Sequence, residues 1–394
     1  MENVLDIVLI LITVLIGFNS SLFFKNLLEK SDIKVINYLW SYHLIICFIF
    51  YFYIQANGGD AINYWETVKQ NTNTSILDYF SLGFGTYFMY VLNYFPSKIL
   101  ELSLLTGSIM YAFIGFLGFV YFYLLFKKHI KYNPKLLGVQ LFPWIFFLPN
   151  LHFWTVGIGK DSLLFFCIAL FFYGINDIKK HYGKIVLALL LAYFARPHIA
   201  AFMVGSYALG VLLDGKLKVY SKIVLSIVVI STFVLFFNSI MLYLRIENFD
   251  FDTLSSYSND KVEKLSRDHT GSSVDISEYP FPLKVFTFLY RPFFFDINGV
   301  LALLASFENL ILLIVSLKLI KLNPFKMFFK GNFIYKSLTL FLLMGVISFS
   351  LILGNLGIML RQKNMFIPAL LFIYLWSYSF SCQLKENQSY NRYH

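Results

Sequence analysis

Residues 103–126 read SLLTGSIMYAFIGFLGFVYFYLLF, and Lys127-Lys128 follow them directly. The stretch contains no charged residue. It is longer than the roughly 20 apolar residues that an α-helix needs to cross the hydrocarbon core of a bilayer. The stretch therefore predicts a transmembrane helix that ends at a pair of lysines.

Similar runs recur along the chain and predict an all-α, polytopic integral membrane protein with about eleven transmembrane helices. Of its 394 residues, 58% are hydrophobic and 14% are charged, whereas a soluble domain carries about 25% charged residues. A water-soluble fold could not cover its surface with so few charged residues. The expected spans are 4–24, 37–55, 103–126, 136–152, 162–176, 185–195, 199–213, 222–244, 298–320, 337–355 and 364–380.

Two local features refine this prediction. The N-terminal MENVLD lacks a basic n-region and a small-residue cleavage site, so we expect a first membrane helix and not a signal peptide. Arg196-Pro197 separates two short runs, because proline removes a backbone donor and ends or kinks a helix. Helix boundaries near 79–102 and 185–213 stay open. The three cysteines, Cys47, Cys167 and Cys382, have no spacing that predicts a disulfide framework or a zinc site.

The basic residues predict the orientation. With the N-terminus outside and the C-terminus in the cytoplasm, the inner segments hold 20 of the 32 basic residues and five of the 22 acids. This matches the positive-inside rule, and it explains the net charge of +10 without nucleic acid as a partner. The inner segments are 25–34, 127–135, 177–184, 214–222, 318–336 and 385–392.

The remaining organisation is simple. We expect a single transmembrane domain, residues 1–394, in the inner (cytoplasmic) membrane of a bacterium, with long outer loops at about 56–102 and 245–297. Five of the six arginines, Arg196, Arg245, Arg267, Arg291 and Arg361, fall on the outer side. Arginine is better suited than lysine to bidentate phosphate recognition, although ordinary interfacial anchoring is the alternative.

Ionisable residues at membrane depth are expensive and are functional candidates by default. The first candidate segment is Gly58-Gly59-Asp60-Ala61-Ile62-Asn63-Tyr64-Trp65-Glu66. The glycines allow a sharp turn, which places Asp60 at the interface as a general base for a sugar hydroxyl. The alternative is a turn that precedes an interfacial helix.

The second segment, Gly157-Ile158-Gly159-Lys160-Asp161-Ser162, contains Gly-Lys but fails as a phosphate-binding P-loop. Position 154 is Trp where that motif has its first glycine, and Asp161 replaces the required Ser or Thr. We expect a tight turn that presents Lys160 to an anion, with Asp161 and Ser162 able to cap the next helix.

The third segment is Ala195-Arg196-Pro197-His198. Arg196 cannot lose its charge, so it needs an anion or a water-filled cavity. The anion is either a substrate or a carboxylate of the protein, such as Asp161. His198 is a candidate base or donor, although a lone histidine is more often structural.

The fourth segment, residues 354–368, contains Arg361, Gln362 and Lys363 between glycines and Pro368, and Arg291-Pro292 is related to it. Together Arg196, Arg291, Arg361 and Lys160 predict a cationic pocket for a polyprenyl pyrophosphate at the outer leaflet. No cluster has metal-ligand spacing, so the sequence predicts neither a metal nor another cofactor.

These segments together resemble a family. The patterns D-x3-Y (Asp60, Tyr64), F-W-T-x-G-I-G-K-D (153–161), A-R-P-H (195–198) and G-N-x-G-I-x-L-R-Q-K-x-x-x-x-P (354–368) resemble bacterial repeat-unit polymerases of surface polysaccharides. These are the Wzy-type O-antigen polymerases and the related EpsG-like proteins. The resemblance covers residues 60–370. This chain departs from it in having two outer loops of similar size where such polymerases often have one dominant loop.

The resemblance implies a helical bundle like that of the GT-C glycosyltransferases, polyprenyl-pyrophosphate-linked glycans as substrates, and essential arginines at positions matched by Arg196, Arg291 and Arg361. The expected function is polymerisation of lipid-linked repeat units into O-antigen, capsule or exopolysaccharide. Asp60, Arg196, His198 and Arg361 are then the candidate catalytic residues. The substrate-binding candidates are Lys160, Asp161, Arg291, Gln362, Lys363, Tyr64 and Glu66.

Two alternatives with an activity stay open, besides a purely structural assembly partner. One is a GT-C enzyme that adds one sugar from a polyprenyl phosphate donor, in which Asp60 and Glu66 would dominate. The other is a lipid-linked glycan transporter or flippase, which the hydropathy does not favour because it shows no inverted repeat. Expected partners are lipid-linked glycans and membrane lipids, with a chain-length regulator left open and no nucleic acid.

Overall fold

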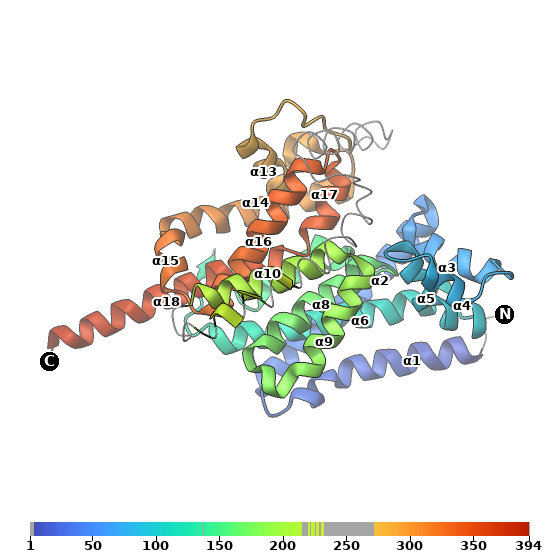
Figure 1. Cartoon of the computed structure of the whole chain (residues 1–394), viewed down its shortest axis with the longest axis horizontal. Coiled ribbons are helices and arrows are strands. Elements are labelled where there is room, and N and C mark those ends of the chain that lie inside the picture. Colours follow the sequence, from blue (N-terminus) through green and yellow to red (C-terminus); the bar gives the residue numbers. More distant parts are fainter. Residues whose placement is uncertain are drawn as a thin grey trace. The chain divides into compact units, whose positions relative to one another are not determined.

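The computed structural model describes residues 4–136, 138–214, 220, 222–224, 226–227, 230–231 and 272–393 (Figure 1). The chain forms two compact units. Unit 1 comprises Met1–Leu125 and Phe146–Ala200, and unit 2 comprises Phe126–Ile145 and Ala201–His394. Most of the predicted span 222–244 lies outside the described residues, and so do Arg245 and Arg267.

The described chain is almost entirely helical, as expected for an all-α membrane protein. Seven helical segments of this described part are long and apolar enough to cross a membrane. They are α1 (Val4–Asn19) with the 3-10 helix η1 (Ser20–Phe24), α2 (Lys30–Asn57), α6 (Leu104–His129), the segment formed by α8 (Lys160–Gly174) and α9 (Ile178–Ala195), α14 (Val300–Lys321), α16 (Phe333–Ile352), and the first part of α18 (Ile367–Tyr393).

Helices α8 and α9 form a hairpin and not one long helix. The 3-10 helix η4 (Ile175–Asp177) joins them, and His181 has non-helical dihedral angles. A Cβ placed on Gly174 would come within 2.8 Å of the Ile185 side chain. Eleven residues of straight helix would separate these positions by about 16 Å, so the chain must fold back on itself. The two separate runs expected from the sequence therefore pack against each other.

Small residues allow the other helices of unit 1 to approach closely. Gly17 of α1 leaves no room for a side chain beside Trp40 of α2, whose indole N–H donates to the carbonyl of Val14 at 3.1 Å. Gly118 of α6 lies against Phe165 of α8 in the same way. Close approach at small residues is typical of membrane helices, because packing replaces the hydrophobic effect as the source of association.

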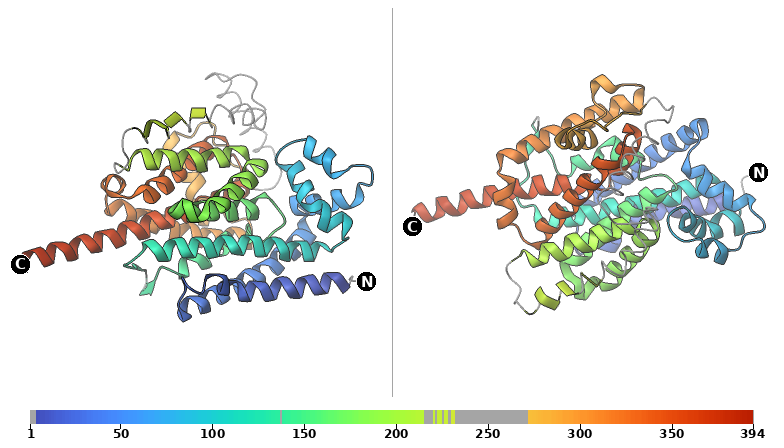
Figure 2. Two further views of the ribbon diagram at one scale, coloured as in Figure 1. Left: turned by 60° about the horizontal axis from the view of Figure 1, so that its bottom comes forward. Right: turned by 45° about the horizontal axis from the view of Figure 1, so that its top comes forward.

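The first expected outer loop is largely helical. Helices α3 (Asp60–Gln70), α4 (Ile76–Ser81) and α5 (Thr86–Asn93) and the π-helix η2 (Tyr94–Ile99) fill residues 60–99 (Figure 2). Trp65 holds them together: it is fully buried, its indole N–H donates to the Leu102 carbonyl at 3.1 Å, and its own carbonyl accepts from Ser97. We call residues 60–99 the helical cap of unit 1.

The expected span at 136–152 is wrong. This stretch contains the short antiparallel strands β1 (Lys135–Leu136) and β2 (Val139–Gln140), the 3-10 helix η3 (Trp144–Phe147) and the five-residue helix α7 (Pro149–Phe153). Gly138 has a φ of +83°, which right-handed helices do not contain. Pro143 and Pro149 each remove a backbone donor, so no helix of spanning length forms there.

Unit 2 contains most of α10 (Pro197–Leu212), together with α13 (Phe281–Tyr290), the 3-10 helix η5 (Phe294–Asp296), α14, α15 (Pro324–Lys330), α16, α17 (Leu356–Lys363) and α18. The rings of Tyr335 on α16 and Trp376 on α18 lie 4.4 Å apart, and Gly345 of α16 lies against Phe366, just before α18. Helix α16 thus packs along α18, and the described part of unit 2 is a helical bundle.

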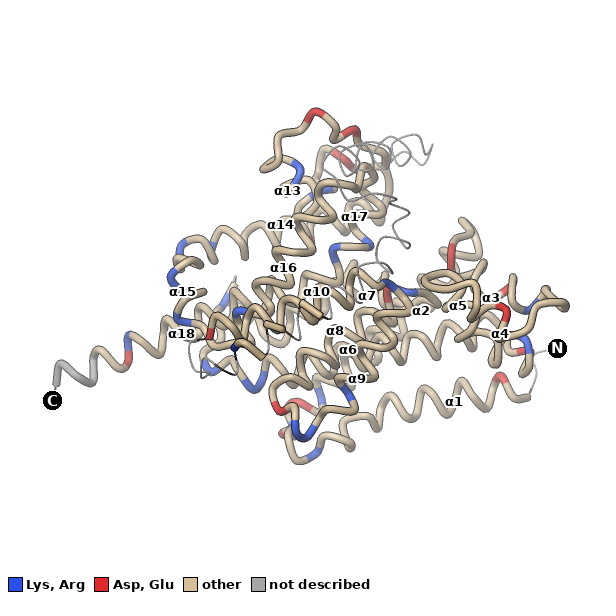
Figure 3. The backbone as a smooth tube through the Cα atoms, in the orientation of Figure 1, with Lys and Arg blue, Asp and Glu red and all other residues tan. Residues whose placement is uncertain are grey.

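Most lysines of unit 1 gather at one end of it, although a few lie in or beside the helical cap (Figure 3). Lys184 lies over the Tyr121 ring near the end of α6, and Phe24, just before Lys25, contacts the same ring at 5.5 Å. The other ends of α1 and α6 are joined by Asp6, whose carboxylate accepts from the Ser103 amide at 2.8 Å and from the Thr106 hydroxyl. The helical cap joins this second end, because Trp65 bonds to Leu102 at the start of α6.

Candidate functional site

Two glycines position the Asp60 segment. Helix α2 ends at Asn57, Gly58 and Gly59 have φ angles of +73° and +140°, and α3 begins at Asp60. Side chains rarely adopt such angles, so the expected sharp turn is confirmed. Asp60 is exposed in the first turn of α3, and Tyr64, one turn further along the same face, is buried. Glu66 is half-buried on this helix.

Lys160 begins α8, and Gly159 is the N-cap residue. Asp161 and Ser162 therefore lie inside the first turn, and the expectation that they cap the helix is wrong. The Ser162 hydroxyl donates to the carbonyls of Gly157 and Gly159 at 2.7 and 3.0 Å, which closes the glycine turn. Asp161 instead places negative charge at the positive end of the α8 dipole.

Arg196 ends α9 in an extended conformation, with φ −154° and ψ 96°, as expected for a residue that precedes proline. Its amide still donates to the Ala192 carbonyl at 2.8 Å, while its guanidinium leaves the helix. The guanidinium forms an ion pair with Asp161 at 3.1 Å, and both side chains are less than 10% exposed. The alternative in which a carboxylate of the protein neutralises Arg196 is thus confirmed.

Lys160 links this ion pair to the helical cap. Its ammonium donates to the Thr86 hydroxyl at 3.3 Å and lies 5.6 Å from the centre of the Tyr64 ring. The Gly85 amide donates to the Phe194 carbonyl at 2.8 Å, which fixes α5 beside the end of α9. His198 is half-buried and follows Arg196 by two residues, in the first turn of α10.

Three of the four candidate segments therefore meet within unit 1. We call the group formed by Tyr64, Thr86, Lys160, Asp161, Arg196 and His198 the unit 1 cluster. It contains two cations and one carboxylate beside a tyrosine, and the exposed Asp60 lies one helical turn before that tyrosine on α3. The sequence did not indicate Thr86, because a threonine 74 residues before Lys160 carries no signal of its own.

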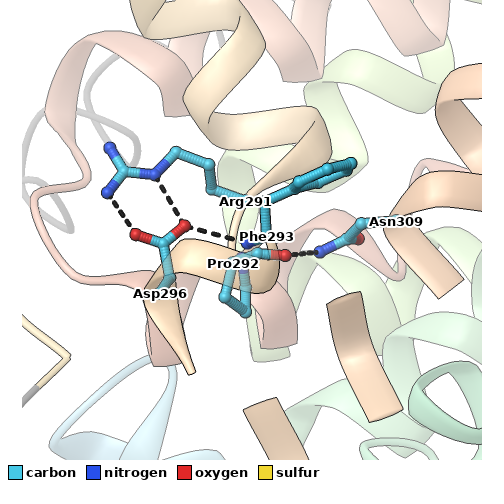
Figure 4. A network of polar contacts seen from close by, with 5 residues as sticks. All are labelled: Arg291, Pro292, Phe293, Asp296 and Asn309. Atoms are coloured by element: carbon cyan, nitrogen blue, oxygen red, sulfur yellow. Dashed lines mark hydrogen bonds and ion pairs between the residues drawn. The ribbon is translucent and has the colours of Figure 1, made fainter. Parts of the chain in front are cut away.

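Arg291 in unit 2 resembles Arg196 in that it precedes a proline and pairs with an aspartate (Figure 4). It ends α13 before Pro292, and its guanidinium donates to both oxygens of Asp296 at 3.0 and 2.5 Å. The Phe293 amide also donates to Asp296, at 2.8 Å. Burial raises the pKa of Asp296, but these hydrogen bonds and the charge of Arg291 together lower it by more, so its pKa lies below the ordinary value. The two partners are only five residues apart in the chain.

The ammonium of Lys363 is bonded to groups of the protein itself. Its buried ammonium donates to the carbonyls of Leu289 and Arg291 at 3.1 and 3.2 Å and to the Asn309 side chain at 2.5 Å. An ammonium has three N–H groups, so these acceptors use all of them. Burial lowers the pKa of Lys363 to about 7, against an opposing effect of the Glu308 carboxylate. We therefore assign Lys363 to the junction of α13, α14 and α17.

The other residues of the fourth segment lie on α17. Gln362 is buried and Arg361 is half-buried. Lys160 and Arg196 belong to unit 1, and Arg291 and Arg361 belong to unit 2, so a joint pocket of all four cations stays a prediction. Across the described residues, no group of three or more His, Cys, Asp or Glu side chains could hold a metal ion, and the three cysteines are free.

A buried histidine pair in unit 1 was not expected from the sequence. His43 of α2 and His152 of α7 share a hydrogen bond of 2.7 Å between their Nδ1 atoms. The Nε2 atom of His152 lies 2.7 Å from the Phe146 carbonyl, to which it donates. His152 therefore accepts at Nδ1, and His43 donates to it. The pair joins α2 to α7, which precedes the Lys160 turn.

Comparisons of this chain with protein-family models, with curated proteins and with solved structures each return no match. The expected resemblance to polysaccharide polymerases therefore stays a prediction from four sequence segments, three of which contribute residues to the unit 1 cluster.

Proposed function

We propose that the chain is a membrane glycosyltransferase that polymerises polyprenyl-pyrophosphate-linked repeat units at the outer leaflet. The observation that carries the proposal is the ion pair of Arg196 with Asp161 beside Lys160. Two cations at membrane depth, held by three different parts of the sequence, suit a diphosphate that arrives through the bilayer.

The positions of the charges support the orientation. Within unit 1, the lysine-rich helix ends contact one another through Tyr121, whereas the helical cap and the cluster lie at the end of α6 that holds Asp6. We infer that the lysine-rich end is cytoplasmic and that the N-terminus is outside. About eleven spans and a GT-C-like bundle remain part of the proposal.

In the proposed reaction, a hydroxyl oxygen of the acceptor sugar attacks the anomeric carbon of the donor glycan. The bond from that carbon to the pyrophosphate oxygen breaks, and the leaving polyprenyl pyrophosphate keeps the electron pair. Lys160 and Arg196 stabilise the charge that develops on it. The acceptor proton passes to Asp60, which is exposed one helical turn before Tyr64 on α3, or to His198.

The test is a Lys160→Gln variant, with Lys69→Gln as the matched control. Lys69 lies on α3 in the helical cap and is half-buried, but it is outside the cluster. Removing one preorganised contact to a developing charge costs about a hundred- to thousandfold in rate. We expect Lys160→Gln to leave single repeat units on their lipid carrier, seen by mass spectrometry, while Lys69→Gln makes normal chains. Normal chains in both variants would refute the proposal.

The single-sugar transferase is the second candidate, and the exposed position of Asp60 at the start of α3 favours it. The two candidates differ in the product that accumulates when the gene is deleted. Complete repeat units at the outer face support polymerisation, whereas units that lack one sugar support the single-sugar transferase. Complete units at the inner face would indicate a transporter.

A further inference from the structure

A second positively charged site lies in unit 2, separate from the unit 1 cluster. A cavity of about 240 Å³ opens beside the end of α14. Its lining includes Lys135, Lys318 and Lys321 together with Tyr374 and Tyr378. No carboxylate contributes to the lining.

Three elements bring these side chains together. Lys318 and Lys321 are three residues apart in the last turn of α14, so they share a face of that helix. Tyr374 and Tyr378 are four residues apart on α18 and also share a face. Lys135 comes from strand β1 of the short hairpin. The tyrosine hydroxyls add hydrogen-bonding groups to a surface that would otherwise offer only ammonium groups.

The three lysines have no counter-charge in the part of the chain that the structure describes. None of them forms an ion pair there, whereas Lys336, at the start of α16, lies 4.0 Å from Asp214 and donates to the Leu213 carbonyl. Lysine near a helix C-terminus is favourable by itself, which explains Lys318 and Lys321. It does not explain why Lys135 converges on them from another element.

The surroundings of the cavity are those of a membrane surface. Its volume is below the roughly 300–1,000 Å³ of pockets for drug-sized ligands, so it suits a headgroup and not an oligosaccharide. Large apolar side chains are exposed on α14, which contributes to the lining, and on α15, which follows it in the chain: Ile320 on α14, and Phe325 and Phe329 on α15. Acyl chains would cover such residues, whereas a soluble anion would leave them in water.

We propose that this cavity binds the phosphate of an anionic phospholipid headgroup, with Lys135, Lys318 and Lys321 as the cations and the lipid chains against the apolar residues of α14 and α15. Basic pockets between membrane helices bind acidic lipids by this combination of charge and apolar contact. The inference does not depend on the proposed enzymatic function.

The test uses the full-length protein, purified in detergent and freed of lipid. Phosphatidylglycerol or phosphatidylcholine with the same acyl chains is added, and bound lipid is measured by native mass spectrometry. The cavity variant is Lys135→Gln/Lys318→Gln/Lys321→Gln. The control is Lys128→Gln/Lys326→Gln/Lys330→Gln, which removes the same charge from exposed lysines of unit 2 that do not line the cavity.

Each lysine beside an anionic headgroup contributes about a fivefold gain in affinity, so three contribute about a hundredfold. We expect the cavity variant to lose phosphatidylglycerol by about that factor, with little change in the control and none for phosphatidylcholine. Equal loss in both variants would overturn the proposal, because it would mean general attraction to a basic surface. Displacement of the lipid by millimolar sodium phosphate would also overturn it, in favour of a free phosphate site.

A folding defect would reduce binding for a different reason. The corresponding Lys→Arg triple variant keeps the charge and separates the two causes. It should retain phosphatidylglycerol, and loss of the lipid in this variant at an unchanged melting temperature would count against electrostatic recognition.

Discussion

The ion pair of Arg196 with Asp161 allows the structural and functional roles of the arginine to be separated. Both side chains are more than 90% buried, and Nη2 lies 3.1 Å from Oδ1. At that distance and an effective dielectric constant of about 20, the attraction is about 5 kcal/mol. Removing one partner leaves a buried charge without compensation, which costs about 3–5 kcal/mol. Removing both leaves no buried charge.

We therefore expect Asp161→Asn and Arg196→Gln each to lower the free energy of unfolding by about 3–5 kcal/mol. The double variant should regain most of this loss, because its two amides can form a neutral hydrogen bond. The assay is unfolding in mixed micelles, followed by the near-ultraviolet signal of the tryptophans. Full additivity of the two single changes would refute the inference that the pair stabilises the resting protein.

Activity should not follow stability in this cycle. If the proposed reaction takes place, the double variant should be folded but inactive, because it lacks the Arg196 charge that the proposal assigns to the leaving pyrophosphate, and the loss should be about a hundred- to thousandfold in rate. The readout is glycan chain length in cells that produce equal amounts of each variant. A double variant that is both stable and active would show that Arg196 serves only to neutralise Asp161.

Two further predictions concern stability. Burial lowers the pKa of Lys363 in the folded chain, whereas the unfolded chain has the ordinary lysine pKa of 10.5. Above about pH 7 the unfolded chain therefore binds more protons at this residue than the folded chain does. The free energy of unfolding should therefore rise from pH 7 to pH 10, and Lys363→Met should flatten the rise in denaturant titrations at several pH values. Gly115→Ala would place a Cβ 2.0 Å from the Thr155 carbonyl oxygen, so it should cost about 1–3 kcal/mol in a melting experiment. Gly183→Ala, where nothing lies within 4 Å, should gain about 0.5–1 kcal/mol, and equal effects of the two changes would contradict the packing argument.

The periodic and compositional signals predicted the elements that depend on local sequence. Apolar length located α6 within three residues of its observed ends, and the rule for prolines located the break at Arg196-Pro197. The same rule applied to Pro143 and Pro149 would have excluded the span at 136–152. Hydrophobic content alone suggested that span, because apolar residues buried in a turn have the same composition as those in a membrane helix.

The helical cap shows what the sequence could not predict. Residues 60–99 looked like a loop because their polar and aromatic residues have no long apolar period. Their order depends on tertiary contacts, such as the insertion of Trp65 beside Leu102. The same limit applies to the unit 1 cluster: charge pointed to Lys160, Asp161 and Arg196, but their contact depends on the α8–α9 hairpin.

The two arginines that precede proline differ in the distance to their partners along the chain. Asp296 follows Arg291 by five residues, so that pair can form within one turn and needs no other part of the protein. Asp161 precedes Arg196 by 35 residues and reaches it only after α8 and α9 have packed. The pair of Arg291 and Asp296 is accounted for by its role in a local turn. The pair of Arg196 and Asp161 instead places charge where several elements meet, beside Lys160 and Tyr64. Arg196 is therefore the stronger candidate for substrate contact.

This arrangement also implies a compromise between stability and affinity. Asp161 forms an ion pair with Arg196, so the pyrophosphate of the proposed reaction would have to compete with a carboxylate that is already in place. Removing the Asp161 carboxylate should tighten binding of a diphosphate. It should also destabilise the fold, because the buried charge of Arg196 is then left without a counter-charge. Asp161→Asn should thus raise the affinity for a diphosphate and lower the free energy of unfolding. A purely structural ion pair would lose stability without any gain in affinity for lipid pyrophosphate, so binding to this variant distinguishes the two roles of Asp161.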